Sequence, residues 1–292
     1  MKKGIDISEW QGNLTYDNFK SIKDNGIEFI IIRCGYTGYG KNKNKYKDKY
    51  FENNYELAKQ LDIPVGTYYY SCATTEQEAI EEANYILELI KDKTFEYPIC
   101  IDTEDNHDIN NDSYSNESQY SIGKDRLTSI IKNICKTVEK ENKYVSIYAS
   151  TSWFRNNLNL SKLKDIDKWI AQWSSTVTFD EEYGIWQYSS TGSVDGLNGG
   201  IDMNYSYKDY PEIMKSIGLN GFIKYAEPDI PTETPELPIE TPDIPVIEIP
   251  EELPNIPEEN IEKPTLEDKP GFFSNIFKSI KNIFIKFLNL FK

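Results

Sequence analysis

The sequence has little of the residue types from which metal centres and disulfide frameworks are built. It contains one histidine and four cysteines in 292 residues, and no two cysteines have C-x-x-C spacing. So few cysteines cannot form a dense disulfide framework in a chain of this length. Cys34, Cys72 and Cys100 lie in or beside apolar runs, where a free thiol behaves as a small hydrophobic side chain. We therefore expect reduced core cysteines, and the sequence implies no cofactor.

Positive charge is also scarce. Lys and Arg number 32 against 48 Asp and Glu, which gives a formal net charge of −16. Proteins that bind nucleic acid contact its phosphates through a basic surface, so no nucleic-acid partner is expected. Met1-Lys2-Lys3 leads directly into Gly4-Ile5-Asp6-Ile7, without an apolar segment of signal-peptide length. We expect synthesis in the cytoplasm without a signal peptide.

Short runs rich in β-branched and aromatic residues predict eight strands, separated in the first half by amphipathic helices. The predicted strands cover residues 4–8, 29–36, 64–72, 97–104, 145–150, 168–173, 183–189 and 200–205. The predicted helices cover residues 16–25, 51–61, 75–91 and 123–141, and Thr75 followed by Glu78 fits a capping box. Strand–helix alternation with doubly buried strands indicates parallel strands. The last three strands follow too closely for crossover helices. The fold class is therefore α/β, an irregular (β/α) barrel with its final helices missing.

The predicted barrel covers residues 1–222, and two further segments follow it. Residues 223–270 form an acidic linker: Pro occupies 11 of the 44 positions from 227 to 270, which favours an extended chain. Residues 271–292 place apolar side chains at helical spacing, with lysine, serine and asparagine on the other face. They predict a basic amphipathic helix. Such a helix suits an anionic membrane, a wall polymer or self-association about equally.

Carboxyl groups gather where the predicted strands end. Asp102 and Glu104 are two residues apart, so they share one face of a strand. Asp6 closes the first predicted strand and Asp202 closes the last, and strand ends meet at one rim of an α/β barrel. Crowded carboxyls raise the pKa of at least one of them toward that of a general acid. The pattern favours glycoside hydrolysis; a divalent-metal site and structural carboxylates are the alternatives.

Five motifs, in order, resemble those of glycoside hydrolase family 25 lysozymes over about residues 3–210. They are Gly4 to Gly12 (GIDISEWQG), Ile101 to Glu104 (IDTE), Trp169 to Trp173 (WIAQW), Trp186 to Tyr188 (WQY) and Ile201 to Asn204 (IDMN). The resemblance implies an N-acetylmuramidase that cleaves peptidoglycan with retention and needs no metal.

The resemblance also implies roles for single residues. Glu104 matches the general acid/base, and Asp102 would orient the substrate's 2-acetamido group as it attacks the anomeric carbon. Asp6 and Asp202 match supporting carboxylates. The candidates for substrate binding are Tyr68, Tyr70, Trp173, Gln187 and Tyr188. His107, the only histidine, lies in a polar loop and is a weak candidate for a proton relay.

The expected biological setting follows from the same resemblance. A muramidase without a signal peptide suits a phage endolysin, which is made in the cytoplasm and acts at the bacterial wall after release. A bacterial autolysin exported by another route fits almost as well. A catalytically silent wall-binding module is a third alternative, against which the joint presence of all four carboxyls argues.

Overall fold

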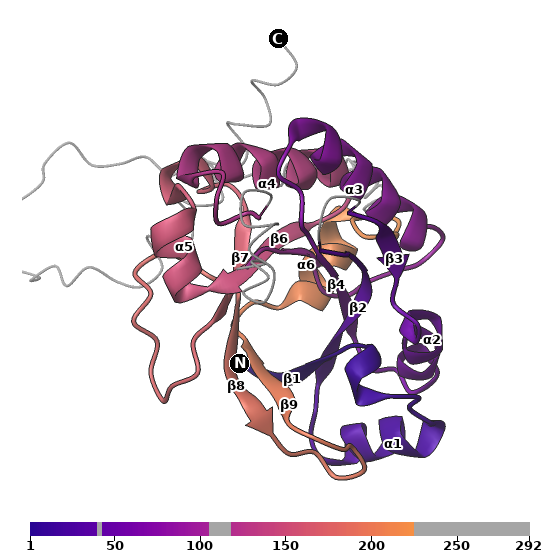
Figure 1. Ribbon diagram of the computed structural model, residues 1–292. Coiled ribbons are helices and arrows are strands. Elements are labelled where there is room, and N and C mark those ends of the chain that lie inside the picture. Colours follow the sequence, from indigo (N-terminus) through magenta and orange to yellow (C-terminus); the bar gives the residue numbers. More distant parts are fainter. Residues whose placement is uncertain (40–42, 105–117, 225–292) are drawn as a thin grey trace, which may run out of the picture. The chain divides into compact units, whose positions relative to one another are not determined.

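The computed structural model describes residues 1–39, 43–104 and 118–224, and these residues form a closed barrel (Figure 1). Eight strands run around it in the order β1-β9-β8-β7-β6-β5-β4-β2, and β2 pairs with β1 to close the ring. The ninth strand, β3, is a three-residue addition antiparallel to β2. The strands are β1 (Lys2–Ile7), β2 (Phe29–Thr37), β3 (Lys45–Lys47), β4 (Val65–Tyr70), β5 (Ile99–Asp102), β6 (Val145–Ser150), β7 (Asp167–Ala171), β8 (Ile185–Gly192) and β9 (Ile201–Ser206). The predicted irregular barrel is confirmed.

The described residues form six α-helices. They are α1 (Tyr16–Asp24), α2 (Phe51–Gln60), α3 (Glu76–Leu89), α4 (Lys124–Glu139), α5 (Thr151–Asn157) and α6 (Tyr210–Ile217), with short 3-10 turns at Glu9–Gln11 and Leu160–Lys162. The predicted capping box at the start of α3 is present: the Thr75 hydroxyl accepts from the backbone of Glu78, and the Glu78 carboxylate accepts from the backbone of Thr75. Within the described residues no helix lies between β7 and β8 or between β8 and β9, as predicted. The short helices α5 and α6 were not predicted.

One expectation about strand direction is wrong. Strands β1, β2, β4, β5, β6, β7 and β8 pair in parallel with their neighbours in that series, whereas β9 is antiparallel to both β8 and β1. The connection from β8 to β9 is too short to return the chain to the other end of the barrel, so β9 must run backwards. Asp202 consequently lies near the start of β9, not at its end. Because the strand is reversed, its start still lies at the rim where β1 ends with Asp6 and Ile7.

The core has two layers, which the alternation of side chains along β2 separates. Ile30 and Ile32 belong to the larger cluster, which packs against the helices, and Phe29 and Ile31 to a second cluster on the other face. In the second cluster the Phe29 ring stacks on Tyr97 with centroids 4.3 Å apart. A Cβ atom at Gly4 would lie 2.4 Å from the Phe29 ring, so only glycine fits there.

Several other expectations concern the whole chain. All four cysteines are buried and none of them forms a disulfide, as predicted. No helix among the described residues is long and apolar enough to span a membrane. The expected linker at 223–270, except for its first two residues, and the expected C-terminal helix at 271–292 lie outside the residues that the structure describes. The domain boundaries therefore stay a prediction.

Candidate active site

The four predicted carboxyls line one cavity. Asp6 comes from β1, Asp102 from the end of β5, Glu104 from two residues further on, and Asp202 from β9. The cavity has a larger part of about 520 Å³ and a smaller part of about 280 Å³. Both parts are lined by the four carboxyls together with Tyr68. The carboxyl cluster therefore lies where the two parts meet.

Asp6 and Asp202 are direct partners in the pairing of β1 with β9. Burial and, after it, the charge of Asp202 together raise the pKa of Asp6 to about 8. Burial raises the pKa of Asp202 to about 6. Both carboxyls therefore hold protons at pH values where a solvated aspartate is ionised.

Two amide side chains hold Asp6 in place. Its Oδ2 atom accepts from Nε2 of Gln187 at 2.9 Å and from Nδ2 of Asn204 at 2.7 Å. These two bonds act against burial and lower the pKa of Asp6. Asn204 follows Asp202 by two residues, so the strand period places both on the same face. That spacing is the signal in the sequence that could have identified Asn204 as a site residue.

Indole and phenol groups fix the two amides in turn. Oε1 of Gln187 accepts from the Tyr148 hydroxyl and from Nε1 of Trp173, both at 3.0 Å. Oδ1 of Asn204 accepts from Nε1 of Trp169 at 2.8 Å. Since each amide oxygen is occupied by a donor, each amide nitrogen is turned toward Asp6. Gln187, predicted to bind substrate, thus supports Asp6; it is 2% exposed and lines the smaller part of the cavity.

Asp102 and Glu104 form a pair of unequal exposure. Asp102 is buried, whereas Glu104 is exposed. Burial, the charge of Glu104 and a hydrogen bond between the two carboxyls raise the pKa of Asp102 well above its usual value. A hydrogen bond between carboxyls needs a proton on one of them. Oδ1 of Asp102 is buried and has no hydrogen-bond partner among the described residues.

A buried ion-pair cluster forms part of the wall of the larger part. Arg33 donates from Nε to Asp48 and from Nη2 to Glu9, both at 2.8 Å. Asp48 also accepts from the backbone of Glu9 at 2.9 Å, which holds the turn after β1. The prediction from sequence missed this cluster. Its signal was a single arginine inside the otherwise uncharged run from Phe29 to Tyr36.

Aromatic side chains line both parts of the cavity. Tyr68 and Tyr70 line the larger part, as does Trp10, which is 81% exposed. Trp173 lines the smaller part and is 64% exposed. Tyr188 is not among the lining residues of either part, because its ring stacks on another tyrosine, Tyr205, with centroids 4.4 Å apart.

Two other expectations concern proton relay and metals. His107 lies outside the described residues. Among residues 1–39, 43–104 and 118–224 no three His, Cys, Asp or Glu side chains are arranged to hold a metal ion.

The family is decided by comparison with known proteins. The family model of the glycosyl hydrolases family 25 matches residues 5–197, a range that contains Asp6, Asp102 and Glu104. The chain belongs to glycosyl hydrolase family 25. Asp202 lies just beyond the matched range, but it is paired in register with Asp6.

Several family 25 relatives resemble this chain. The autolytic lysozyme of Clostridium acetobutylicum is 27% identical over 207 residues, which cover 69% of this chain and 55% of that one. Among solved structures, the CTP1L endolysin is 26% identical with a TM-score of 0.60, covering 73% of this chain and 69% of that chain. The modular autolysin LytC from Streptococcus pneumoniae, in complex with a synthetic peptidoglycan ligand, is 27% identical with a TM-score of 0.60, covering 70% and 46%. The chain thus spans about half the length of two of these three relatives.

Proposed function

We propose that this protein is a lysozyme, an N-acetylmuramidase that cleaves the β-1,4 bond between N-acetylmuramic acid and N-acetylglucosamine in peptidoglycan. One observation carries the proposal: four carboxyls from three strands meet at the junction of the two parts of the cavity. Family membership supports glycoside hydrolysis. The lysozyme name of one relative and the peptidoglycan ligand bound to another support the substrate.

In the proposed reaction Glu104 is the general acid. Its exposure lets it reach the oxygen of the leaving sugar, and its hydrogen bond with Asp102 means that the pair holds a proton to give. The C–O bond to the leaving sugar breaks as that proton moves to the oxygen. Glu104 then acts as a base toward the water that completes hydrolysis.

Asp102 assists through the substrate in this proposal. The 2-acetamido oxygen attacks the anomeric carbon, and Asp102 orients the acetamido N–H and stabilises the positive charge that develops. The Oδ1 atom that lacks a partner among the described residues supports this role, since a buried acceptor needs a donor. The water attacks from the opposite face of the intermediate, so the configuration at the anomeric carbon is retained overall.

Asp6 and Asp202 have supporting roles. Their raised pKa values place additional carboxyl protons close to the reacting pair. A charge on Asp6 raises the pKa of Asp102, so ionisation of Asp6 favours retention of the proton that the Asp102–Glu104 pair holds.

The glycan is proposed to cross the carboxyl cluster and occupy both parts of the cavity. Exposed aromatic faces suit the apolar faces of sugar rings, and the two parts each contribute one, Trp10 and Trp173. Tyr68 and Tyr70 are proposed as further substrate contacts. Tyr188, whose ring stacks on Tyr205, stays a predicted contact.

Mass spectrometry of fragments released from purified peptidoglycan tests the proposal. The reducing-end sugar identifies the bond that was cut. Muramic acid at the new reducing end is the expected result, and glucosamine there would contradict it. Release of no fragments at all would favour the silent wall-binding module.

The biological setting is proposed as that of an endolysin, made in the cytoplasm and acting on the wall after release. The similarity to the CTP1L endolysin supports it. The similarity to the autolytic lysozyme of Clostridium acetobutylicum favours an autolysin as the second candidate. The genomic neighbourhood separates the two: phage structural and holin genes beside this gene support the endolysin.

A further inference from the structure

Thr103, which lies between the two reacting carboxyls, is held by side chains on the other face of its strand end. Its side chain is fully buried. The Thr103 hydroxyl accepts from Nε1 of Trp153 at 3.2 Å and donates to Oε1 of Gln119 at 2.8 Å. Because neighbouring side chains in an extended segment point to opposite faces, these contacts lie away from the cavity that Asp102 and Glu104 line.

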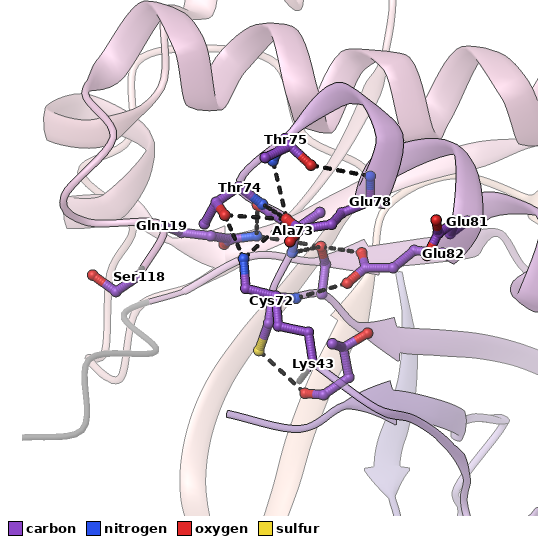
Figure 2. A network of polar contacts seen from close by, with 12 residues as sticks. Lys43, Cys72, Ala73, Thr74, Thr75, Glu78, Glu81, Glu82, Ser118 and Gln119 are labelled. Carbon is purple, nitrogen blue, oxygen red and sulfur yellow. Dashed lines mark hydrogen bonds and ion pairs between the residues drawn. The ribbon is translucent and has the colours of Figure 1, made fainter. Parts of the chain in front are cut away.

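The bonds continue from Gln119 to a buried acid. Nε2 of Gln119 donates to Oγ of Ser71 at 3.2 Å and to the backbone oxygen of Ala73 at 3.2 Å. Oγ of Ser71 donates to Oε2 of Glu82 at 2.5 Å. Glu82, on α3, is 2% exposed, and its other oxygen accepts from the backbone of Cys72 at 3.0 Å. Figure 2 shows Gln119 reaching Ala73 and Glu82 meeting Cys72 within one network.

The direction of each hydrogen bond in this series follows from the groups at its two ends, the N–H of Trp153 and the carboxyl of Glu82. Two N–H donors, from Gln119 and Ala73, point at Oγ of Ser71, so the single hydroxyl proton must go to Glu82. The Thr103 hydroxyl accepts from Trp153 and so gives its proton to Gln119. An acceptor oxygen on Glu82 is therefore what lets all five side chains be satisfied at once.

Backbone hydrogen bonds to neighbouring strands hold the main chain as far as Thr103. The N–H of Ser71 donates to the backbone oxygen of Asp102 at 2.9 Å, and the N–H of Thr103 donates to that of Tyr148 at 3.0 Å. Glu104 follows directly, with its side chain exposed. The direction in which Glu104 leaves the barrel is consequently set at Thr103.

We propose that Thr103, Gln119 and Ser71 are positioning residues. Their hydrogen bonds connect the buried Glu82 to the segment that carries Glu104, and so hold the Glu104 carboxyl in line with the leaving oxygen. The inference rests on the proposed muramidase activity. It assigns a role in the reaction to residues that do not line the cavity. It also predicts a specific kinetic pattern, because a misplaced acid slows proton transfer without weakening the binding of the glycan.

The experiment compares Thr103→Val, which removes the hydroxyl but keeps the shape, with Thr103→Ser, which keeps the hydroxyl. Ser71→Ala breaks the chain at a distance from the carboxyls and serves as the second variant if Thr103→Val does not fold. The matched control is Thr67→Val. Thr67 is equally buried on β4, but its hydroxyl donates to the backbone of Ile32 and takes no part in the chain of bonds.

Steady-state hydrolysis of soluble peptidoglycan fragments is measured well below each variant's melting temperature. Thr103→Val and Ser71→Ala are expected to lower kcat by about 10- to 100-fold, with KM within about two-fold of wild type. Thr103→Ser should restore most of kcat, and Thr67→Val should leave it unchanged.

An active wild type with an unchanged kcat in Thr103→Val and Ser71→Ala would overturn the positioning role alone. Equal losses in all three hydroxyl-removing variants, the control included, would also overturn it. An inactive wild type would overturn the proposed function and the positioning role together.

Discussion

Asp6 and Asp202 lie directly opposite each other in the antiparallel pair β1–β9. One residue comes near the end of its strand and the other near the start, yet both are at the same rim. Neither carboxyl is solvated as in water, and the pKa of each is raised, to about 8 and about 6. Asp6 therefore holds a proton at neutral pH and Asp202 holds one up to about pH 6, and this has consequences for stability as well as for activity.

The first prediction concerns stability against pH. Unfolded aspartates have pKa values near 4, so the folded barrel binds protons that the unfolded chain releases, at Asp202 between about pH 4 and pH 6 and at Asp6 between about pH 4 and pH 8. Stability must then fall as pH rises through that window. Glu82, whose pKa burial raises to about 7, acts in the same direction. The melting temperature is expected to be higher at pH 5 than at pH 8.

Asp6→Asn provides the check on this assignment. The amide oxygen can still accept from Gln187 and Asn204, but the group no longer titrates. The variant should narrow the difference in melting temperature between pH 5 and pH 8. Each kcal/mol of unfolding free energy that no longer depends on pH should reduce that difference by about 2–4 °C. A variant with the full wild-type difference would show that Asp6 is not a source of it.

The second prediction is that Glu104→Gln abolishes turnover while the fold is kept. The amide has the shape of the acid but cannot give a proton to the leaving oxygen, and general acid catalysis contributes about 10²- to 10⁴-fold. Turnover of peptidoglycan and the melting temperature are both measured. Glu56→Gln, an exposed change on α2, is the control and should be silent. More than about a tenth of wild-type activity in Glu104→Gln would remove the residue from this role.

The third prediction is that Asp102→Asn loses most activity. The neutral amide stabilises the cyclised acetamido intermediate poorly, so the intermediate forms more slowly. The loss is expected at about 10²-fold or more. A neutral substitution would show that assistance through the substrate does not depend on Asp102, even if Glu104 is confirmed as the acid.

The fourth prediction is that activity survives exhaustive treatment with EDTA. The four carboxyls are assigned to proton transfer and charge stabilisation, so chelation should leave the rate unchanged. Loss of activity on chelation followed by recovery with Mg²⁺ or Ca²⁺ would instead identify a site of oxygen ligands.

The fifth prediction concerns residues 271–292, which lie outside the described part of the chain. A helix there would place nine apolar side chains on one face, and burying each contributes about 1.5–3 kcal/mol. Such a face needs a membrane, a wall polymer or another copy of the helix to cover it. Truncation after Pro270 should leave hydrolysis of soluble glycan fragments unchanged but lower lysis of intact cells, or lower the mass in light scattering. A truncated protein equal to full length in cell lysis, liposome binding and mass would exclude all three occupants.

The features that the sequence could predict are those with a short period. Alternation of side chains placed Asp102 and Glu104 on one face, and apolar runs located eight of the nine strands. The direction of β9 was harder, because an alternating pattern reads the same along either direction of a strand. The short connection before it was the available signal. Strand β3 covers only Lys45–Lys47 and has no apolar run to mark it.

The supporting contacts could not be predicted, because they join residues far apart in the sequence. Gln187 and Asn204 meet Asp6 across more than 180 positions, and Gln119 reaches Ser71 across 48. Nothing local in the sequence indicates that Gln119 acts on the segment between Asp102 and Glu104. Such partners follow from barrel closure and helix packing, which no short window contains.

Because the four cysteines are buried, the stability of the barrel should not depend on whether the solution is oxidising or reducing. The thiolate is the form of cysteine that oxidants and other disulfides attack. Burial raises the pKa of Cys34 to about 12 and that of Cys135 well above its ordinary value. The folded barrel thus offers these thiols to neither oxidant nor reductant. A protein built in this way needs no oxidative maturation, and we expect its melting temperature to be the same in dithiothreitol as in oxidised glutathione.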